Sequence, residues 1–133
     1  PKLVAIDLLP IIPIEGITTL QGDFSKDSIK KQITEIFKGK KIDLILSDLS
    51  PTLTGIKIVD SSKINEFGEM VLDFCKAHLS KNGIILMKTF QGNGHSELIS
   101  SFNKVFSHVG KDKPSSSRSE SAEVFVLAKN LLN

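Results

Sequence analysis

Tryptophan and tyrosine are absent from the 133-residue sequence, and cysteine and arginine occur once each, as Cys75 and Arg118. A single cysteine excludes a disulfide framework and a cysteine-rich zinc site within the chain. Because Cys75 lies in the apolar stripe of an expected helix, we predict a buried structural thiol. A single arginine leaves phosphate contacts mostly to lysine, so bidentate recognition of phosphate or guanine involves few residues. Stacking on a nucleic-acid base would have to use phenylalanine.

Long apolar runs are also missing. No segment approaches the roughly 18 residues that a transmembrane helix needs, and the first residues do not resemble a cleavable signal. We therefore expect no membrane contact, and an intracellular protein of the cytoplasm, nucleus or mitochondrion. A hydrophobic content of 40% supports one sizeable core, which predicts a single domain over residues 1–133. The net charge of +2 is too small to predict a nucleic-acid partner by itself.

Apolar periodicity predicts strands and helices that alternate along the chain. The expected strands cover residues 3–7, 17–20, 42–47, 83–88, 108–113 and 123–129, and the expected helices cover residues 26–38, 61–79 and 96–107. Ser25 and Ser96 are the expected N-caps, and Gly39 suits the left-handed residue that ends the first helix. This alternation indicates a parallel, doubly wound α/β sheet with helices on both faces.

Three segments place an ionisable residue at the end of a β-like apolar run. Asp48 and Lys88 close the third and fourth expected strands, and Glu123 opens the last one. Ligands of open α/β sheets bind outside the carboxyl ends of the parallel strands. Glu123 reaches the same edge if the last strand runs antiparallel to the others, as mixed sheets allow. The pattern therefore predicts an acid, a lysine and a second acid around one site.

Five motifs carry a resemblance to a known family. In chain order they are Asp7-Leu8-Leu9-Pro10, Gln21-Gly22-Asp23-Phe24, Ser47-Asp48-Leu49-Ser50-Pro51, Lys88-Thr89-Phe90-Gln91-Gly92 and Lys113-Pro114-Ser115-Ser116-Ser117-Arg118. Each motif alone is weak, but the five in this order resemble the FtsJ family of S-adenosylmethionine-dependent RNA ribose 2'-O-methyltransferases. The resemblance runs along nearly the whole chain. It implies a Rossmann-like methyltransferase sheet with an antiparallel last strand.

The resemblance also implies catalytic residues. The family's catalytic set is Lys-Asp-Lys-Glu, and its last three members fall on Asp48, Lys88 and Glu123. The first lysine of the set would lie before Pro1, and so would the family's first strand and Gly-rich cofactor loop. We therefore expect a methyltransferase domain that lacks this first part.

S-adenosylmethionine is the cofactor that the resemblance implies. The family's acid that holds the ribose hydroxyls falls on Asp7, and the acid near the adenine falls on Asp23, beside Phe24. Asp48 also lies near the cofactor in this family. A carboxylate at the end of a strand suits a ribose because it accepts hydrogen bonds from both hydroxyls.

The chemistry restricts the role of the lysine. Methyl transfer from a sulfonium to a hydroxyl needs in-line approach at about 3 to 3.5 Å and removal of the hydroxyl proton. A lysine with the ordinary pKa of about 10.4 is almost wholly charged, so a base role for Lys88 requires something that favours its neutral form. Our hypothesis is that Asp48 and Glu123 orient Lys88 and the ribose, while cofactor binding helps to deprotonate Lys88.

Histidine spacing and glycine spacing give no further site. His78, His95 and His108 lack the spacing of a metal site, so we expect no metal and histidines that are satisfied or face solvent. The segment Gln91-Gly92-Asn93-Gly94 lacks the third glycine of a dinucleotide fingerprint, and a plain strand-to-helix turn is the better prediction. The expected phosphate contacts are Lys57, Lys63, Lys111, Lys113 and Arg118.

Several functions stay open at this point. The third and fourth motifs are closer to the ribosomal-RNA branch of the family than to its transfer-RNA branch, so we expect a ribosomal RNA substrate. We also expect a monomer. The alternatives are a transfer-RNA 2'-O-methyltransferase, a noncatalytic RNA-binding relative, and a nicotinamide-dependent dehydrogenase. A dehydrogenase could have the same sheet and the same Asp7 position, but its reaction does not require an acid, a lysine and a second acid at one edge of the sheet.

Overall fold

The computed structural model of the chain describes residues 3–7, 12–47, 55–112 and 123–132. It divides into two compact units, Pro1–Lys41 and Ile42–Asn133. The expected single domain over residues 1–133 stays a prediction. Within the described ranges, no helix combines the length and apolarity needed to cross a bilayer.

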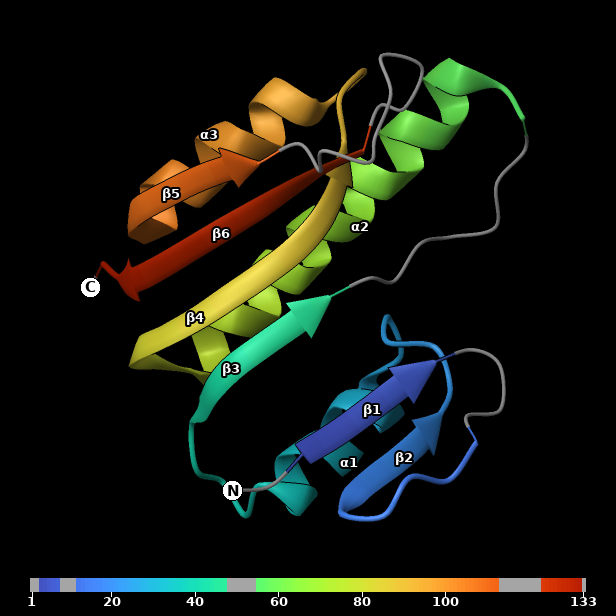
Figure 1. The fold of residues 1–133 in the computed structure, drawn as a ribbon, viewed down its shortest axis with the longest axis vertical. Coiled ribbons are helices and arrows are strands. Elements are labelled where there is room, and N and C mark those ends of the chain that lie inside the picture. The colour runs from blue at the N-terminus through green and yellow to red at the C-terminus, as the bar shows by residue number, and fades with distance from the viewer. Residues whose placement is uncertain (1–2, 8–11, 48–54, 113–122, 133) are drawn as a thin grey trace. The chain divides into compact units, whose positions relative to one another are not determined.

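The first unit is a parallel strand pair with one helix. β1 (Leu3–Asp7) pairs in parallel with β2 (Ile17–Gln21), and α1 (Asp27–Ile36) lies behind the two strands in Figure 1. The predicted apolar stripe of this helix is correct, because it buries Ile29 and Ile33. The carboxyl ends of two parallel strands lie at one edge, so the residues after β1 and after β2 leave from the same side of the pair.

The second unit holds a mixed four-stranded sheet. Its strands are β3 (Ile42–Ser47), β4 (Leu79–Phe90), β5 (Phe106–Asp112) and β6 (Glu123–Leu131), in the spatial order β3-β4-β6-β5. β3 and β4 are parallel, and β6 is antiparallel to both of its neighbours. The reversed last strand that the sequence predicts is therefore confirmed, and it lies inside the sheet rather than at its edge (Figure 1).

Two helices cover one face of this sheet. α2 (Lys57–His78) and α3 (His95–Val105) both lie behind it in Figure 1. The side chains of β4 and β6 that alternate toward these helices are buried: Ile85, Met87, Thr89, Val124, Val126 and Ala128. Cys75 of α2 is 0% exposed, which confirms the predicted buried thiol. Each large apolar side chain buried in this way contributes about 1.5 to 3 kcal/mol relative to exposure.

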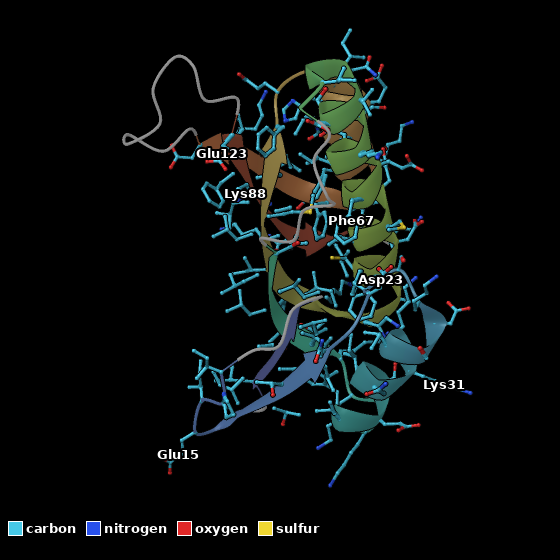
Figure 2. All side chains as sticks on the ribbon, turned by 90° about the vertical axis from the view of Figure 1, so that its right-hand side faces the viewer. Glu15, Asp23, Lys31, Phe67, Lys88 and Glu123 are labelled. Atoms are coloured by element: carbon cyan, nitrogen blue, oxygen red, sulfur yellow. The ribbon has the colours of Figure 1, made fainter. Side chains whose placement is uncertain are left out.

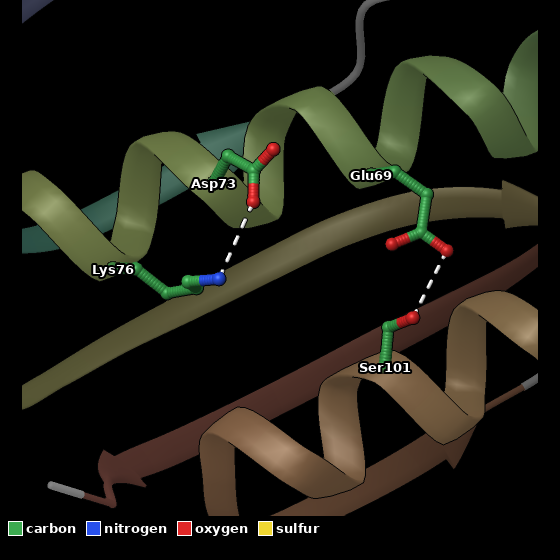
Figure 3. Close-up of polar contacts among 4 residues, drawn as sticks. All are labelled: Glu69, Asp73, Lys76 and Ser101. Carbon is green, nitrogen blue, oxygen red and sulfur yellow. Dashed lines mark hydrogen bonds and ion pairs between the residues drawn. The ribbon is translucent and has the colours of Figure 1, made fainter.

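A polar contact also joins the two helices. The Ser101 hydroxyl of α3 donates a hydrogen bond of 3.0 Å to the Glu69 Oε2 of α2 (Figure 3). One turn further along α2, Lys76 Nζ lies 3.5 Å from Asp73 Oδ1 in an exposed pair. Lys76 and Asp73 both belong to α2, and exposed ion pairs of this kind add little stability.

The other face of the sheet is apolar but exposed. Leu44 and Leu46 of β3 are 54% and 68% exposed, and Ile84 and Leu127 lie beside them with 36% and 46% exposure. Neighbouring pairs in the ladders place these four side chains on one face. The continuous apolar runs in the sequence thus supply both faces of β3 and β4, and α2 and α3 cover one of them.

The start of β4 differs from the prediction. The sequence predicts a strand from residue 83, whereas the observed strand begins at Leu79. The register with β3 shifts in this part, because Ile42 pairs with Leu79 but Leu44 pairs with Ile84. The segment 80–83 is therefore accommodated as an irregularity in the ladder.

Both predicted N-caps are wrong. α1 begins after Lys26 rather than Ser25, and α3 begins after Gly94 rather than Ser96, without a side-chain cap in either case. Gly94 has a φ of +88°, which a glycine adopts at low cost, so the chain turns into α3 two residues earlier than expected. The prediction for Gly39 is confirmed, because its φ is +74° just after α1.

Candidate active site

Lys88 and Glu123 meet on one face of the four-stranded sheet. Lys88 Nζ lies 3.3 Å from Glu123 Oε2, and Figure 2 shows both side chains on the side of the sheet away from α2. Lys88 is opposite Phe125 and Glu123 is opposite Phe90, so the ion pair is diagonal in the ladder. With 21% and 36% exposure, both side chains stay partly accessible. The predicted meeting of this lysine and this acid is confirmed, and their catalytic roles stay predictions.

Asp48, the third predicted member of the site, lies outside the described residues. The residue before it, Ser47, is the last of β3 and pairs in register with Met87, the residue before Lys88. Ser47 and Met87 therefore lie side by side in the sheet, and the predicted site residues Asp48 and Lys88 come directly after them in the sequence. This placement supports the predicted edge, while the position of Asp48 itself stays a prediction.

A hydrogen-bond chain lies on the covered face, behind the ion pair. The Thr89 hydroxyl donates to the Val124 carbonyl oxygen at 2.9 Å and is 3.0 Å from His95 Nε2. Thr89 is 0% exposed and His95 is 8% exposed. Sequence reasoning predicted a satisfied or solvent-facing histidine and did not connect it with Thr89. Two features of the sequence could have indicated this contact, namely a hydroxyl at an inward position of the strand and a histidine shortly after the strand ends.

The turn between β4 and α3 is attached to α2. Asn65 Nδ2 donates to the carbonyl oxygens of Phe90 and Asn93, at 3.3 and 2.9 Å, and the Asn93 N–H donates to Ser61 Oγ at 3.2 Å. The other amide atom of Asn65, Oδ1, is buried without a hydrogen-bond partner. The predicted strand-to-helix turn is confirmed, and α2 fixes the backbone just beyond β4, the strand that carries Lys88.

Gly92 belongs to the same turn. Its φ is +142°, and a Cβ at this position would lie 3.0 Å from Ser61 Cβ and 3.1 Å from Ser61 Oγ. Both the backbone conformation and the close approach require glycine. The turn can therefore pack against α2 only because this position has no side chain.

Three of the four predicted cofactor residues, Asp7, Asp23 and Phe24, lie in the first unit, and the fourth, Asp48, lies outside the described residues. Asp7 is the last residue of β1 and pairs with Gln21, the last residue of β2. Asp7 is therefore at the edge of the parallel pair where β2 also ends, and Asp23 comes two residues after that end. The side chain of Asp7 is outside the described part of the structure. Phe24 is buried at 7% exposure, with Lys30 Nζ 5.9 Å from its ring centroid.

The Asp23 carboxylate is oriented locally. The Ser25 hydroxyl and the Ser25 N–H both donate to Asp23 Oδ1, at 2.7 and 2.9 Å. These hydrogen bonds, followed by the charge of Lys26, hold the pKa of Asp23 below its ordinary value. Asp23 is therefore an anionic acceptor at neutral pH, and the hydroxyl expected to cap α1 serves this carboxylate instead.

The histidines and acids do not form a metal site in the part of the chain that is described. No group of three or more histidine, cysteine, aspartate or glutamate residues is close enough there to hold an ion.

The three histidines have different environments. His78 packs against Phe74, with ring centroids 4.3 Å apart, and His108 is exposed. Burial, and then the charge of Lys111, lower the pKa of His95 below its ordinary value.

Comparison with known proteins decides the family. The model of the FtsJ-like methyltransferases matches residues 1–131. The chain belongs to the FtsJ-like methyltransferase family. The resemblance of the five sequence motifs is thereby confirmed, and the nicotinamide-dependent dehydrogenase is no longer an alternative for this FtsJ-like chain.

Curated relatives carry a more specific name. The ribosomal RNA large subunit methyltransferase E of Bordetella parapertussis is 37% identical over 130 residues, which cover 98% of this FtsJ-like chain and 62% of the relative. The protein of the same name from Leptothrix cholodnii is 37% identical over 126 residues, 95% of the chain and 54% of the relative. The chain thus spans less than two thirds of the length of these relatives.

Solved structures agree with the fold. A Plasmodium falciparum protein described as a ribosomal RNA methyltransferase superposes with a TM-score of 0.86 at 28% identity, covering 99% of this FtsJ-like chain and 73% of that protein. A Streptococcus mutans methyltransferase, solved in complex with S-adenosylhomocysteine, has a TM-score of 0.54 at 14% identity and covers 98% and 72%. The second likeness concerns the fold alone. The Rossmann-like methyltransferase fold predicted from the sequence is confirmed.

Proposed function

We propose that the protein carrying this chain transfers a methyl group from S-adenosylmethionine to a ribose 2'-hydroxyl of RNA, with ribosomal RNA as the substrate class. The observation that carries the proposal is the contact of Lys88 with Glu123 on the sheet of an FtsJ-like chain. Relatives named for ribosomal RNA support that substrate class over transfer RNA.

The residues of the first unit fit the proposed cofactor. When bound, S-adenosylmethionine supplies a methyl group on a positively charged sulfur. The Asp23 carboxylate is anionic and is oriented by Ser25, so it suits the hydrogen-bond donors of an adenosyl group. Asp7 and Asp48 are the further acceptors in this proposal, for the ribose hydroxyls and for the region near the methyl group. Phe24, at 7% exposure, would shape the adenine side of the site mainly through packing.

Lys88 is the proposed base. As a neutral amine it has one lone pair for the ribose hydroxyl proton and N–H donors for a carboxylate. Glu123, whose Oε2 is 3.3 Å from Lys88 Nζ, accepts such a hydrogen bond and directs the lone pair toward the acceptor oxygen. With the cofactor bound, Lys88 would accept the proton that the ribose hydroxyl loses when its oxygen takes the methyl group from the sulfur. The same carboxylate then stabilises the resulting ammonium.

The test compares two lysine variants of the natural full-length protein. Lys88→Met keeps the length of the side chain but removes the amine, and we expect the methylation rate to fall by about 10²-fold or more. Lys76→Met is the matched control, because Lys76 forms only an exposed pair on α2. Tritiated S-adenosylmethionine with ribosomal or transfer RNA gives the rate, and nuclease digestion with mass spectrometry identifies the methylated nucleoside.

Three outcomes distinguish the parts of the proposal. Loss of turnover in Lys88→Met with unchanged cofactor affinity by calorimetry supports the base assignment. Turnover of Lys88→Met within threefold of the control contradicts it. Cofactor binding without methylation of any RNA by the wild type would favour the noncatalytic RNA-binding relative.

A further inference from the structure

We infer that Thr89 and His95 are positioning residues, which set the separation of Lys88 and Glu123 by tying their two strands together from the covered face. The inference rests on the proposed function of that pair. Neither residue faces the accessible side of the sheet, since Thr89 is 0% and His95 8% exposed. They act through the backbone that carries the ion pair.

The ladder register places this contact directly behind the ion pair. Thr89 follows Lys88 in β4, Val124 follows Glu123 in β6, and Thr89 pairs with Val124. The hydrogen bond of 2.9 Å from the Thr89 hydroxyl to the Val124 carbonyl oxygen therefore links the two strands between the residues of the pair. A change in strand separation at this point would be transmitted to Lys88 and Glu123 on the opposite face.

The second bond fixes the direction of the first. A threonine hydroxyl has one proton, and Thr89 donates that proton to Val124, so its 3.0 Å contact with His95 Nε2 must receive a proton from the imidazole. His95 thus carries its proton on Nε2, in accord with a pKa lowered by burial and by Lys111. An imidazole held in this tautomer locks the hydroxyl toward β6.

His95 is itself firmly placed. It is the first residue of α3, directly after the turn that Asn65 and Ser61 attach to α2. The Asn65 amide also donates to the carbonyl oxygen of Phe90, the last residue of β4. The contacts therefore run from α2 through the turn to His95, then to Thr89 and across to β6.

Apolar side chains would fill the same positions without polar groups. The neighbouring inward positions on these strands are apolar: Ile85, Met87, Val126 and Ala128. A buried hydroxyl and imidazole stabilise a fold little more than apolar residues of equal shape, but their hydrogen bonds are directional. Directional hydrogen bonds hold the positions of a catalytic pair, and position matters because a displacement of about 1 Å lowers the reaction rate by roughly 10²-fold.

The principal test is Thr89→Val in the natural full-length protein, which keeps the shape and removes the hydroxyl. We expect kcat for RNA methylation to fall by about tenfold with KM for both substrates within twofold, and Thr89→Ser to restore kcat to within threefold of the wild type. Thr34→Val is the matched control, because that hydroxyl only donates to the Lys30 carbonyl oxygen within α1.

Two further measurements do not depend on turnover. Nitrogen-correlated NMR of the histidines should show the Nε2–H tautomer of His95 in the wild type and its loss in Thr89→Val. Hydrogen exchange of the Lys88 and Phe125 amides should become about tenfold faster in Thr89→Val and recover in Thr89→Ser. His95→Phe should reproduce these effects on kcat and exchange, and the double variant should be no worse than either single one, since both act through one contact.

Specific results overturn the inference. Wild-type kcat and exchange in Thr89→Val, or additive losses in the double variant, contradict it while leaving the role of Lys88 intact. If the wild type methylates no RNA, the proposed function fails, and the tautomer and exchange results alone decide whether the strands are tied in this way. Should Thr89→Val not fold, kcat and amide exchange of His95→Phe decide the question, and wild-type values of both in His95→Phe contradict the inference.

Discussion

Glu123 lies opposite Phe90 in the β4–β6 ladder, yet its carboxylate reaches back to Lys88, whose Nζ is 3.3 Å away. This diagonal contact crosses between two antiparallel strands.

Replacement of Glu123 by glutamine should reduce methylation without loss of cofactor binding. The amide keeps the size of the side chain but removes the charge that orients Lys88, so we expect kcat to fall by about 10- to 100-fold. Steady-state kinetics and calorimetric titration with S-adenosylmethionine provide the measurement. Asp73→Asn, in the exposed pair of α2, is the control and should change neither value. An unaltered kcat in Glu123→Gln would remove this residue from the site.

Gly92→Ala should destabilise the protein by about 1 to 3 kcal/mol. A φ of +142° strains any residue with a Cβ, and this Cβ would lie 3.0 Å from Ser61. Urea unfolding measures the change in free energy. Gly110→Ala is a suitable control, since a Cβ there meets nothing within 4 Å and its φ is ordinary. Equal stability of the two variants would show that the turn relaxes freely.

His95 should make stability depend on pH in the acidic range. Its folded-state pKa lies below the ordinary value of 6.5, so the unfolded chain binds more protons as the pH falls. The contribution of neutral His95 is therefore complete above about pH 6.5 and is lost as the pH falls through the folded-state pKa. Urea midpoints at pH 7.5 and 5.5 should differ more in the wild type than in His95→Gln. Parallel pH dependence in both proteins would assign the loss to other groups.

Cys75 should be unreactive in the folded protein. Its side chain is 0% exposed, and burial raises the pKa of the thiol to about 12, so almost no thiolate is present at pH 8. Ellman's reagent should therefore label this thiol only in urea. Ser100→Cys adds an exposed thiol on α3, which should react within minutes. Rapid labelling of Cys75 in buffer would indicate that α2 separates readily from the sheet.

Local pattern predicted most of the elements. The apolar period of α2 and α3, the strands that carry Lys88 and Glu123, and the turn that separates Phe90 from α3 all follow from residues near in sequence. Helix starts were predicted less well. The side chains of Ser25 and Ser96 are suited to cap a helix, but α1 begins after Lys26 and α3 begins after Gly94. In the first case a carboxylate, Asp23, competes for the hydroxyl.

By itself the sequence determined the types of residue at the strand ends and, through five motifs in order, the resemblance to the family, which in turn implied the reversal of the last strand. Only the tertiary structure decided that Glu123 reaches Lys88 diagonally and that Thr89, Val124 and His95 are joined behind them. Those contacts join residues up to 35 positions apart. Their geometry depends on ladder register and on how α3 packs, and neither leaves a periodic signal in the sequence.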